Sequence, residues 1–160
     1  MIKRLFLFML IFCIPFLLFA ETILLYTITE ASADDLEQFS DFIESGVMNE
    51  FFDAGHIVFN AAVSGLIPEV GLDHYKEPAS MQMAKAGGAS FLLEVKLVYS
   101  EVQGKNLPSY AGFQLIEVAT GDLLKEGSVS IDKKWIDEGD FENGITAMGR
   151  SMASYALSFL

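Results

Sequence analysis

Residues 113–131 read FQLIEVATGDLLKEGSVSI, and this stretch decides the predicted fold. Two apolar, β-prone runs flank the four residues ATGD. Gly121 supplies the positive φ that a tight turn needs, and the side chains of Thr120 and Asp122 can bond the local backbone. The stretch therefore predicts a β-hairpin within Tyr110–Asp132, and its turn is interpreted as structural rather than as a ligand site.

A second long strand is predicted just upstream of the hairpin. Residues 91–102, FLLEVKLVYSEV, alternate between an apolar set and a set that contains Glu94 and Lys96. One face of this strand is expected to be buried and the other partly wet. Residues 103–109 are interpreted as the connection to the hairpin, and residues 79–86 as a short helix that a Gly-Gly pair ends.

The first third of the chain predicts a strand, a helix and a second strand. Residues 23–28 (ILLYTI) and 57–63 (IVFNAAV) are apolar, β-prone runs. Between them, Leu36, Phe39, Ile43, Val47 and Phe51 recur at spacings of three and four, as on one face of a helix. A strand, a crossover helix and a strand within about 40 residues favour a parallel pair.

The last element, at about 140–160, has a helical apolar stripe in which Gly149, Ala153 and Ala156 are small enough for close approach to a sheet. The predicted fold is α+β: a single mixed β-sheet with helices packed on it, in the order β-α-β-α-β-β-β-α. We expect one domain over residues 21–160, because about 140 residues can bury a core of their own.

The N-terminus predicts export. Lys3 and Arg4 precede an unbroken apolar run from Leu5 to Ala20, the pattern of a signal peptide over residues 1–20. An uncleaved membrane anchor is the alternative, although the run is shorter than the ~20 residues of a full span. The predicted location is the periplasm, or the membrane surface if the segment is retained.

Charge and cysteine content exclude several classes of function. The chain has 10 Lys and Arg against 22 Asp and Glu. Cleavage after Ala20 would leave 8 against 22, a net charge of −14. No nucleic-acid partner is expected, and no strong membrane-surface binding unless the N-terminal segment is retained. The only cysteine is Cys13, so the mature chain would be free of disulfides and of a cysteine nucleophile. A lipidated Cys13 is disfavoured because Phe12 precedes it.

The stretch AKAGGASFLLEVKLVYSEV followed by GFQLIEVATGDLLKEGSVSI resembles a group of bacterial envelope domains. The group includes the lipoprotein activators of penicillin-binding proteins, the periplasmic part of the curli-secretion channel family and the amino-terminal domain of the Tol-system propeller protein. The likeness is carried by Ala84, Gly88, Ala89 and the turn Thr120-Gly121-Asp122. The chain departs from the pattern at Ser90, where an Asp is common, and it has no apparent stalk. The resemblance implies a binding or assembly module.

Catalytic and metal motifs are not evident. The sequence has no G-x-S-x-G motif and no glycine-rich phosphate loop. His56 and His74, the only histidines, lack the spacing of a helical metal site. We therefore predict no enzyme activity, no catalytic or metal residues and no cofactor.

Two segments are candidates for partner binding. The loop at 65–75 places apolar residues in an irregular segment, and Trp135 is the only tryptophan, a residue type common at interface hot spots. The candidate contact residues are Leu66, Ile67, Val70, Leu72, Tyr75 and Trp135. The predicted function is a non-catalytic periplasmic module that docks on another cell-envelope protein. A periplasmic carrier of a small apolar ligand or lipid is the alternative.

Overall fold

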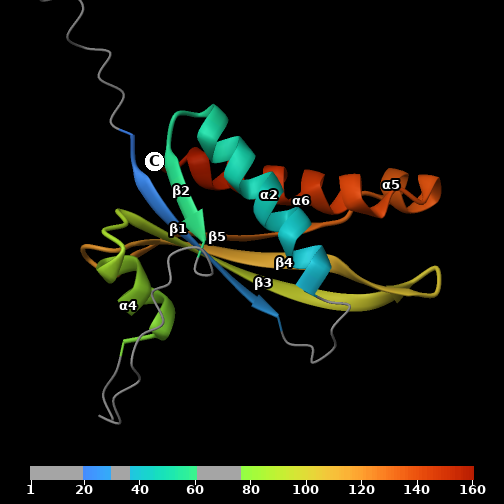
Figure 1. Cartoon of the computed structure of the whole chain (residues 1–160), viewed down its shortest axis with the longest axis horizontal. Helices are drawn as coiled ribbons and strands as arrows, with labels where there is room; N and C mark the ends of the chain where they lie inside the picture. Colours follow the sequence, from blue (N-terminus) through green and yellow to red (C-terminus); the bar gives the residue numbers. More distant parts are fainter. Residues whose placement is uncertain (1–19, 30–36, 61–76) are drawn as a thin grey trace, which may run out of the picture.

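The computed structural model describes residues 20–29, 37–60 and 77–160, and it has the predicted α+β architecture. A five-stranded mixed sheet has helices packed on it (Figure 1). The predicted order of elements is confirmed, with one short helix, α5, added before the last. The elements are β1 Thr22–Thr29, α2 Glu37–Asp53, β2 Ile57–Asn60, α4 Ala79–Ala86, β3 Phe91–Val102, β4 Lys105–Glu117, β5 Leu123–Ser130, α5 Lys133–Glu138 and α6 Phe141–Leu157. Residues 1–19 of the predicted signal segment lie outside the described residues.

The sheet has the strand order β2-β1-β3-β4-β5. β1 pairs in parallel with β2, as the strand-helix-strand pattern predicted, and on its other side it pairs in parallel with β3. β3, β4 and β5 then form an antiparallel meander. Each of the two longest strands, β3 and β4, therefore has a partner on both sides. Among the described elements, β2 and β5 form the edges.

The hairpin of β4 and β5 forms as predicted. Gly121 has a φ of 78°, and its N–H donates to the carbonyl of Glu117 at 2.8 Å. The backbone N–H of Asp122 donates to Oγ1 of Thr120 at 3.1 Å. These bonds satisfy the turn internally, which supports the structural interpretation of the turn residues.

The connection predicted at residues 103–109 is wrong. β4 begins at Lys105, so Gln103 and Gly104 alone join β3 to β4. Their φ angles are 52° and 76°, as a two-residue hairpin with positive φ at both positions requires. Pro108 favoured the prediction of a connection because proline has no backbone N–H to donate to the hydrogen bonds between strands. The strand tolerates it through a register shift that starts opposite Val98 and Tyr99.

Helices α2 and α6 cover one face of the sheet and enclose the main core. They run parallel: Gly149 of α6 lies against Ile43 of α2, and further along both helices Ser154 donates to Glu50 at 2.7 Å. Gly149 was expected to approach the sheet, but its close neighbour is the α2 backbone. The two helices therefore approach each other closely above the sheet.

The other face of the sheet is covered in part. Helix α4 packs a smaller apolar cluster against the beginnings of β1 and β3. The buried members of this cluster are Leu24, Met81, Met83, Ala84, Ala89, Leu92 and Val118. Beyond α4, the same face carries exposed side chains, and there the candidate site lies. No helix among the described residues is long and apolar enough to cross a membrane.

Candidate functional site

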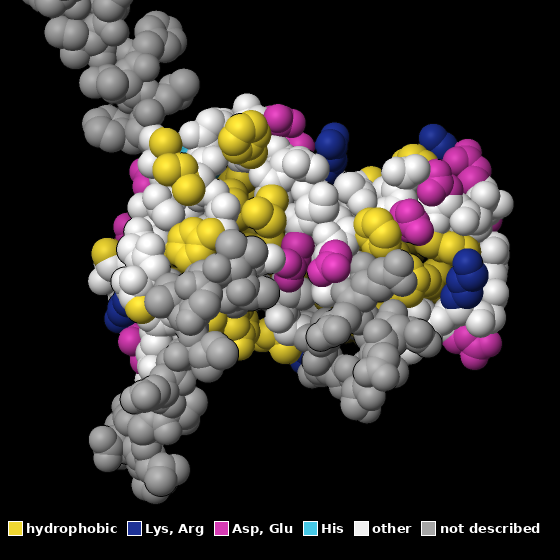
Figure 2. Space-filling model, viewed as in Figure 1, with side chains coloured by type: hydrophobic (Ala, Val, Ile, Leu, Met, Phe, Trp, Pro, Cys, Tyr) yellow, Lys and Arg dark blue, Asp and Glu magenta, His cyan; other side chains and the backbone are white. Residues whose placement is uncertain are grey.

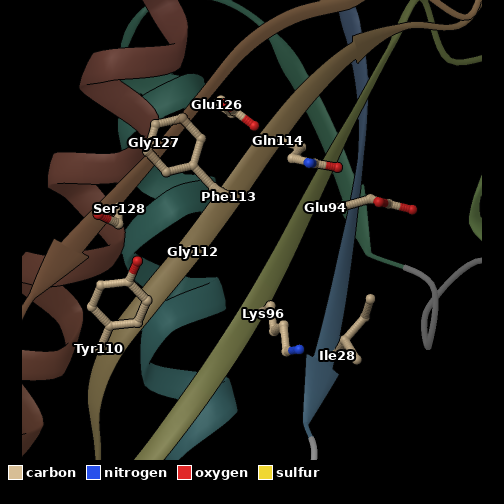
Figure 3. A pocket seen from close by; sticks show the side chains of 10 residues that line it. All are labelled: Ile28, Glu94, Lys96, Tyr110, Gly112, Phe113, Gln114, Glu126, Gly127 and Ser128. Atoms are coloured by element: carbon tan, nitrogen blue, oxygen red, sulfur yellow. The ribbon is translucent and has the colours of Figure 1, made fainter.

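The candidate site is the part of the sheet that α4 does not cover, which we call the open sheet face. Successive side chains of a strand point to opposite faces. The residues that alternate with the core side chains of β1, β3, β4 and β5 therefore gather on this side (Figure 3). We define the open sheet face as Ile28, Glu94, Lys96, Val98, Tyr110, Gly112, Gln114, Glu126 and Ser128.

Seven of these nine residues lie in two neighbouring cross-strand rows, and Val98 and Tyr110 form the next cross-strand pair. The strand register places Tyr26, Glu94, Gln114 and Glu126 in one row. It places Ile28, Lys96, Gly112 and Ser128 in the next row. Neighbouring strands lie about 4.8 Å apart, so each row crosses the sheet over roughly 14 Å. The rows provide a broad surface rather than a narrow catalytic cleft.

A hollow of about 550 Å³ lies over these rows, and Gly112 explains it. A Cβ built on Gly112 would meet only the Tyr110 ring, at 3.9 Å. The space above the middle of β4 is therefore open. Gly127 on β5 differs, because a Cβ there would lie 2.8 Å from the ring of Phe113. Gly112 thus leaves open space above β4, whereas Gly127 makes room for the Phe113 ring.

The face combines apolar contact area with fixed charge. Ile28, Val98 and Tyr110 are large and exposed. Glu94 accepts a hydrogen bond from the hydroxyl of Ser80 on α4, and Ser80 is only 3% exposed. Because this donor is held in the α4 cluster, the carboxylate of Glu94 has a defined position. Aromatic and aliphatic area interspersed with oriented polar groups is typical of protein interfaces.

The residues predicted from the sequence lie elsewhere. Leu66, Ile67, Val70, Leu72 and Tyr75 fall outside the described residues. Trp135 lies in α5, half-buried against the main core and apart from the open sheet face. Its side chain occupies the space beside Gly144, where a built Cβ would approach Trp135 Cβ to 2.6 Å. Lys134 Nζ lies 4.8 Å from the centre of the Trp135 ring.

Sequence reasoning missed the open sheet face. The alternation of Glu94 and Lys96 with apolar residues did indicate a wet side of β3. The extent of the open sheet face depends on where α4 ends and on the register of four strands, and a local sequence pattern reports neither. A further signal in the sequence was Gly112 in the interior of a predicted strand, since an interior strand glycine often marks close approach of another group.

The described histidine has a structural partner. His56 Nδ1 accepts a hydrogen bond from the backbone N–H of Glu21 at 3.2 Å, which joins the start of β1 to the end of the α2–β2 turn. The His56 ring also meets the Phe51 ring edge-on. Across residues 20–29, 37–60 and 77–160, no group of three or more His, Cys, Asp or Glu side chains could hold a metal ion. His74 lies outside the described residues.

Comparison with solved structures finds proteins that are similar to this chain. A PelC variant from Paraburkholderia phytofirmans, solved as a dodecamer, has a TM-score of 0.54 and 15% identity, covering 88% of this chain and 90% of that chain. The LpoB C-terminal domain from Escherichia coli has a TM-score of 0.44 and 16% identity, covering 71% and 83%. TolB from Acinetobacter baumannii has a TM-score of 0.42 and 10% identity, covering 84% and 26%.

The resemblance to bacterial envelope domains that the sequence predicted is confirmed for the fold by the PelC match, whose TM-score is above 0.5. At these identities the similarity concerns the fold alone. No family sequence model and no curated protein sequence matches the chain.

Proposed function

We propose that this chain is an exported, non-catalytic module that docks on another cell-envelope protein through its open sheet face. Export is supported by the charged and apolar pattern of residues 1–20. A fold shared with PelC, a protein solved as a dodecamer, supports a role in assembly. The docking surface itself is inferred from the geometry of the sheet.

The observation that carries the proposal is the face of β3, β4 and β5 that, among the described helices, only α4 covers, and only in part. Helices α2 and α6 cover one face of this sheet, and α4 covers only part of the other face. The exposed Ile28, Val98 and Tyr110 would each release water when a partner covers them, at roughly 25 cal/mol for each Å² of apolar surface. A protein partner that covers these side chains would explain why large apolar residues are exposed here, and no cofactor or catalytic group is needed.

The lining of the hollow favours a protein over an apolar ligand. Glu94, Glu126 and Lys96 all line it, with Gln114 between the two carboxylates. An acyl chain or another small apolar molecule would desolvate these groups without supplying hydrogen bonds. A protein surface can supply complementary donors and acceptors. Trp135, on the helical side of the domain, remains a second proposed contact.

The test places a photo-activatable cross-linking residue at Tyr110 of the full chain in its host cells. Gly112→Leu then fills the hollow, and it is expected to fold because the added side chain points into open space. Ser151→Leu, on the exposed side of α6, is the matched control. We expect Gly112→Leu to abolish one defined cross-linked protein adduct and Ser151→Leu to leave it intact.

Thermal unfolding of each variant separates lost binding from lost structure. If Gly112→Leu folds normally and yields the same adducts in the same amounts, the open sheet face is not the docking surface. A further variant, Trp135→Ala, then tests the second contact by the same measurement.

A further inference from the structure

An acidic row crosses the open sheet face beside its hollow. The strand register sets Glu94, Gln114 and Glu126 side by side on β3, β4 and β5. Neighbouring strands lie about 4.8 Å apart, so the backbones at the two glutamates are about 10 Å apart, with Gln114 between them. Figure 3 shows the three side chains along one line across the sheet. Because an ionised carboxylate only accepts hydrogen bonds, this row calls for donors on whatever enters the hollow.

One end of the acidic row is held in place. The hydroxyl of Ser80, a buried residue of α4, donates a hydrogen bond to Oε1 of Glu94. Glu94 itself is half-buried, whereas Gln114 and Glu126 are exposed. A group that is already ordered loses less conformational freedom when a partner binds to it. Glu94 is therefore the fixed end of the row, and Glu126 is the end that can adjust.

The hollow extends from the acidic row to an aromatic ring. Gln114, Gly112 and Tyr110 alternate along β4, and each step of two residues spans about 6.8 Å. Gly112 has no side chain, and a Cβ built on it would meet only the Tyr110 ring, at 3.9 Å. Ile28 of β1 also lines the hollow. A side chain lying over Gly112 would therefore have apolar neighbours along its length and carboxylates at its tip.

We infer that the protein that docks on the open sheet face inserts an arginine side chain into the hollow over Gly112, an inference that rests on the proposed docking function. The guanidinium group would donate to the acidic row, and its aliphatic stem would lie beside the Tyr110 ring. Arginine combines an apolar stem with a planar group of five N–H donors, which suits a row of acceptors. It is also enriched at protein interfaces, where lysine is depleted.

The charges around the hollow support a cationic occupant. Two carboxylates and one ammonium line it, those of Glu94, Glu126 and Lys96. Lys96 lies in the other row, next to Ile28, and Figure 3 shows its ammonium on the Ile28 side. A partner carboxylate would be repelled by the acidic row, and an apolar anchor would desolvate the row without supplying donors. An arginine supplies both the donors and the opposite charge.

The acidity of the whole chain determines which control is needed. The chain has 10 Lys and Arg against 22 Asp and Glu, and Figure 2 shows carboxylates on several parts of the visible face. Any cationic peptide is therefore attracted to the protein surface in general, an attraction that salt screens. Binding has to be followed at the hollow itself and compared with the loss of carboxylates elsewhere.

The test titrates the isotope-labelled full chain, in uncharged detergent micelles, with capped Gly-Arg-Gly, Gly-Lys-Gly and Gly-citrulline-Gly peptides. Citrulline keeps the shape of arginine without its charge. The NMR signals of the Gly112 and Gln114 amides report on the hollow. We expect the arginine peptide to shift both signals, the lysine peptide to bind more weakly and the citrulline peptide to leave them unchanged.

Two double variants assign the binding to the acidic row. Glu94→Gln with Glu126→Gln keeps an acceptor for the Ser80 hydroxyl and is expected to weaken arginine-peptide binding about tenfold, since an exposed ion pair contributes up to about fivefold. Glu101→Gln with Glu138→Gln removes the same charge from exposed residues outside the lining of the hollow. This control pair is expected to leave the binding nearly unchanged.

Several results would overturn the inference. They are equal binding of the citrulline or lysine peptide, an equal effect of the two double variants, and Gly112 shifts that depend on protein concentration without peptide, which would identify a second copy as the occupant. The cross-link at Tyr110 separates this inference from the docking proposal. If Glu94→Gln with Glu126→Gln keeps the adduct that Gly112→Leu loses, docking stands and the arginine is refuted. If Gly112→Leu keeps the adduct, docking itself fails.

Discussion

The close approach of α2 and α6 makes Gly149→Ala the sharpest test of the fold. A Cβ at this position would lie inside 3.0 Å of the Ile43 carbonyl oxygen and 3.1 Å from the Val47 nitrogen. Both are backbone atoms of α2 and cannot rotate away. Since a carbon and an oxygen normally approach to about 3.3 Å, the helices must separate by roughly 1 Å.

The magnitude follows from two opposing effects. Overpacking a well-filled core costs about 1–3 kcal/mol. Separation also loosens the contacts of Val47 with the core around Met148 and Met152. The higher helix propensity of alanine stabilises α6 by about 1 kcal/mol at most, which offsets part of this loss. We expect a net loss of about 2 kcal/mol, which for a domain of this size lowers the melting temperature by roughly 6–10 °C.

The assay is urea unfolding followed by circular dichroism, with thermal unfolding as a second measure. Ser151→Ala is the matched control on the exposed side of α6, where the serine hydroxyl bonds back to the Ala147 carbonyl at 3.0 Å. Its removal is expected to change stability by a few tenths of a kcal/mol. If Gly149→Ala is as stable as the parent, the two backbones are not in close contact and the argument fails.

Three further predictions concern single side chains. Among the described residues Thr27 Oγ1 is buried without a hydrogen-bond partner, so Thr27→Val should raise the unfolding free energy by about 1 kcal/mol in urea titrations; a loss of stability would imply a bond that valine cannot make. Asp132 accepts from the Lys134 N–H at 2.9 Å as the N-cap of α5, so Asp132→Ala should cost about 1 kcal/mol, and an unchanged midpoint would mean that the cap contributes nothing. Burial raises the pKa of Tyr99 above 10, so the folded state holds its proton longer than the unfolded state, and stability should fall as pH rises above 10. Tyr99→Phe should flatten that fall in alkaline urea titrations, and an identical pH profile would refute the assignment to Tyr99.

Local patterns predicted most of the fold. The bounds of α4 and β3 agree with the structure residue for residue, because Gly87-Gly88 ends one and period-two alternation marks the other. The error at residues 103–109 arose because a proline signals irregular backbone, whereas a register shift in the sheet accommodates Pro108. The short helix α5 was missed because six residues carry too little periodicity to detect.

The sequence by itself determined the composition of each element, the strand-helix-strand order and the hydrophobic N-terminal segment, because these depend on neighbouring residues. Tertiary structure alone decided which surfaces remain exposed. Gly112 opens a hollow only because β3 and β5 flank it and α4 stops short of it. Glu50 and Ser154 meet only because α2 and α6, more than 85 residues apart in the chain, run parallel. Such surfaces arise from contacts between distant segments, and no local pattern records those contacts.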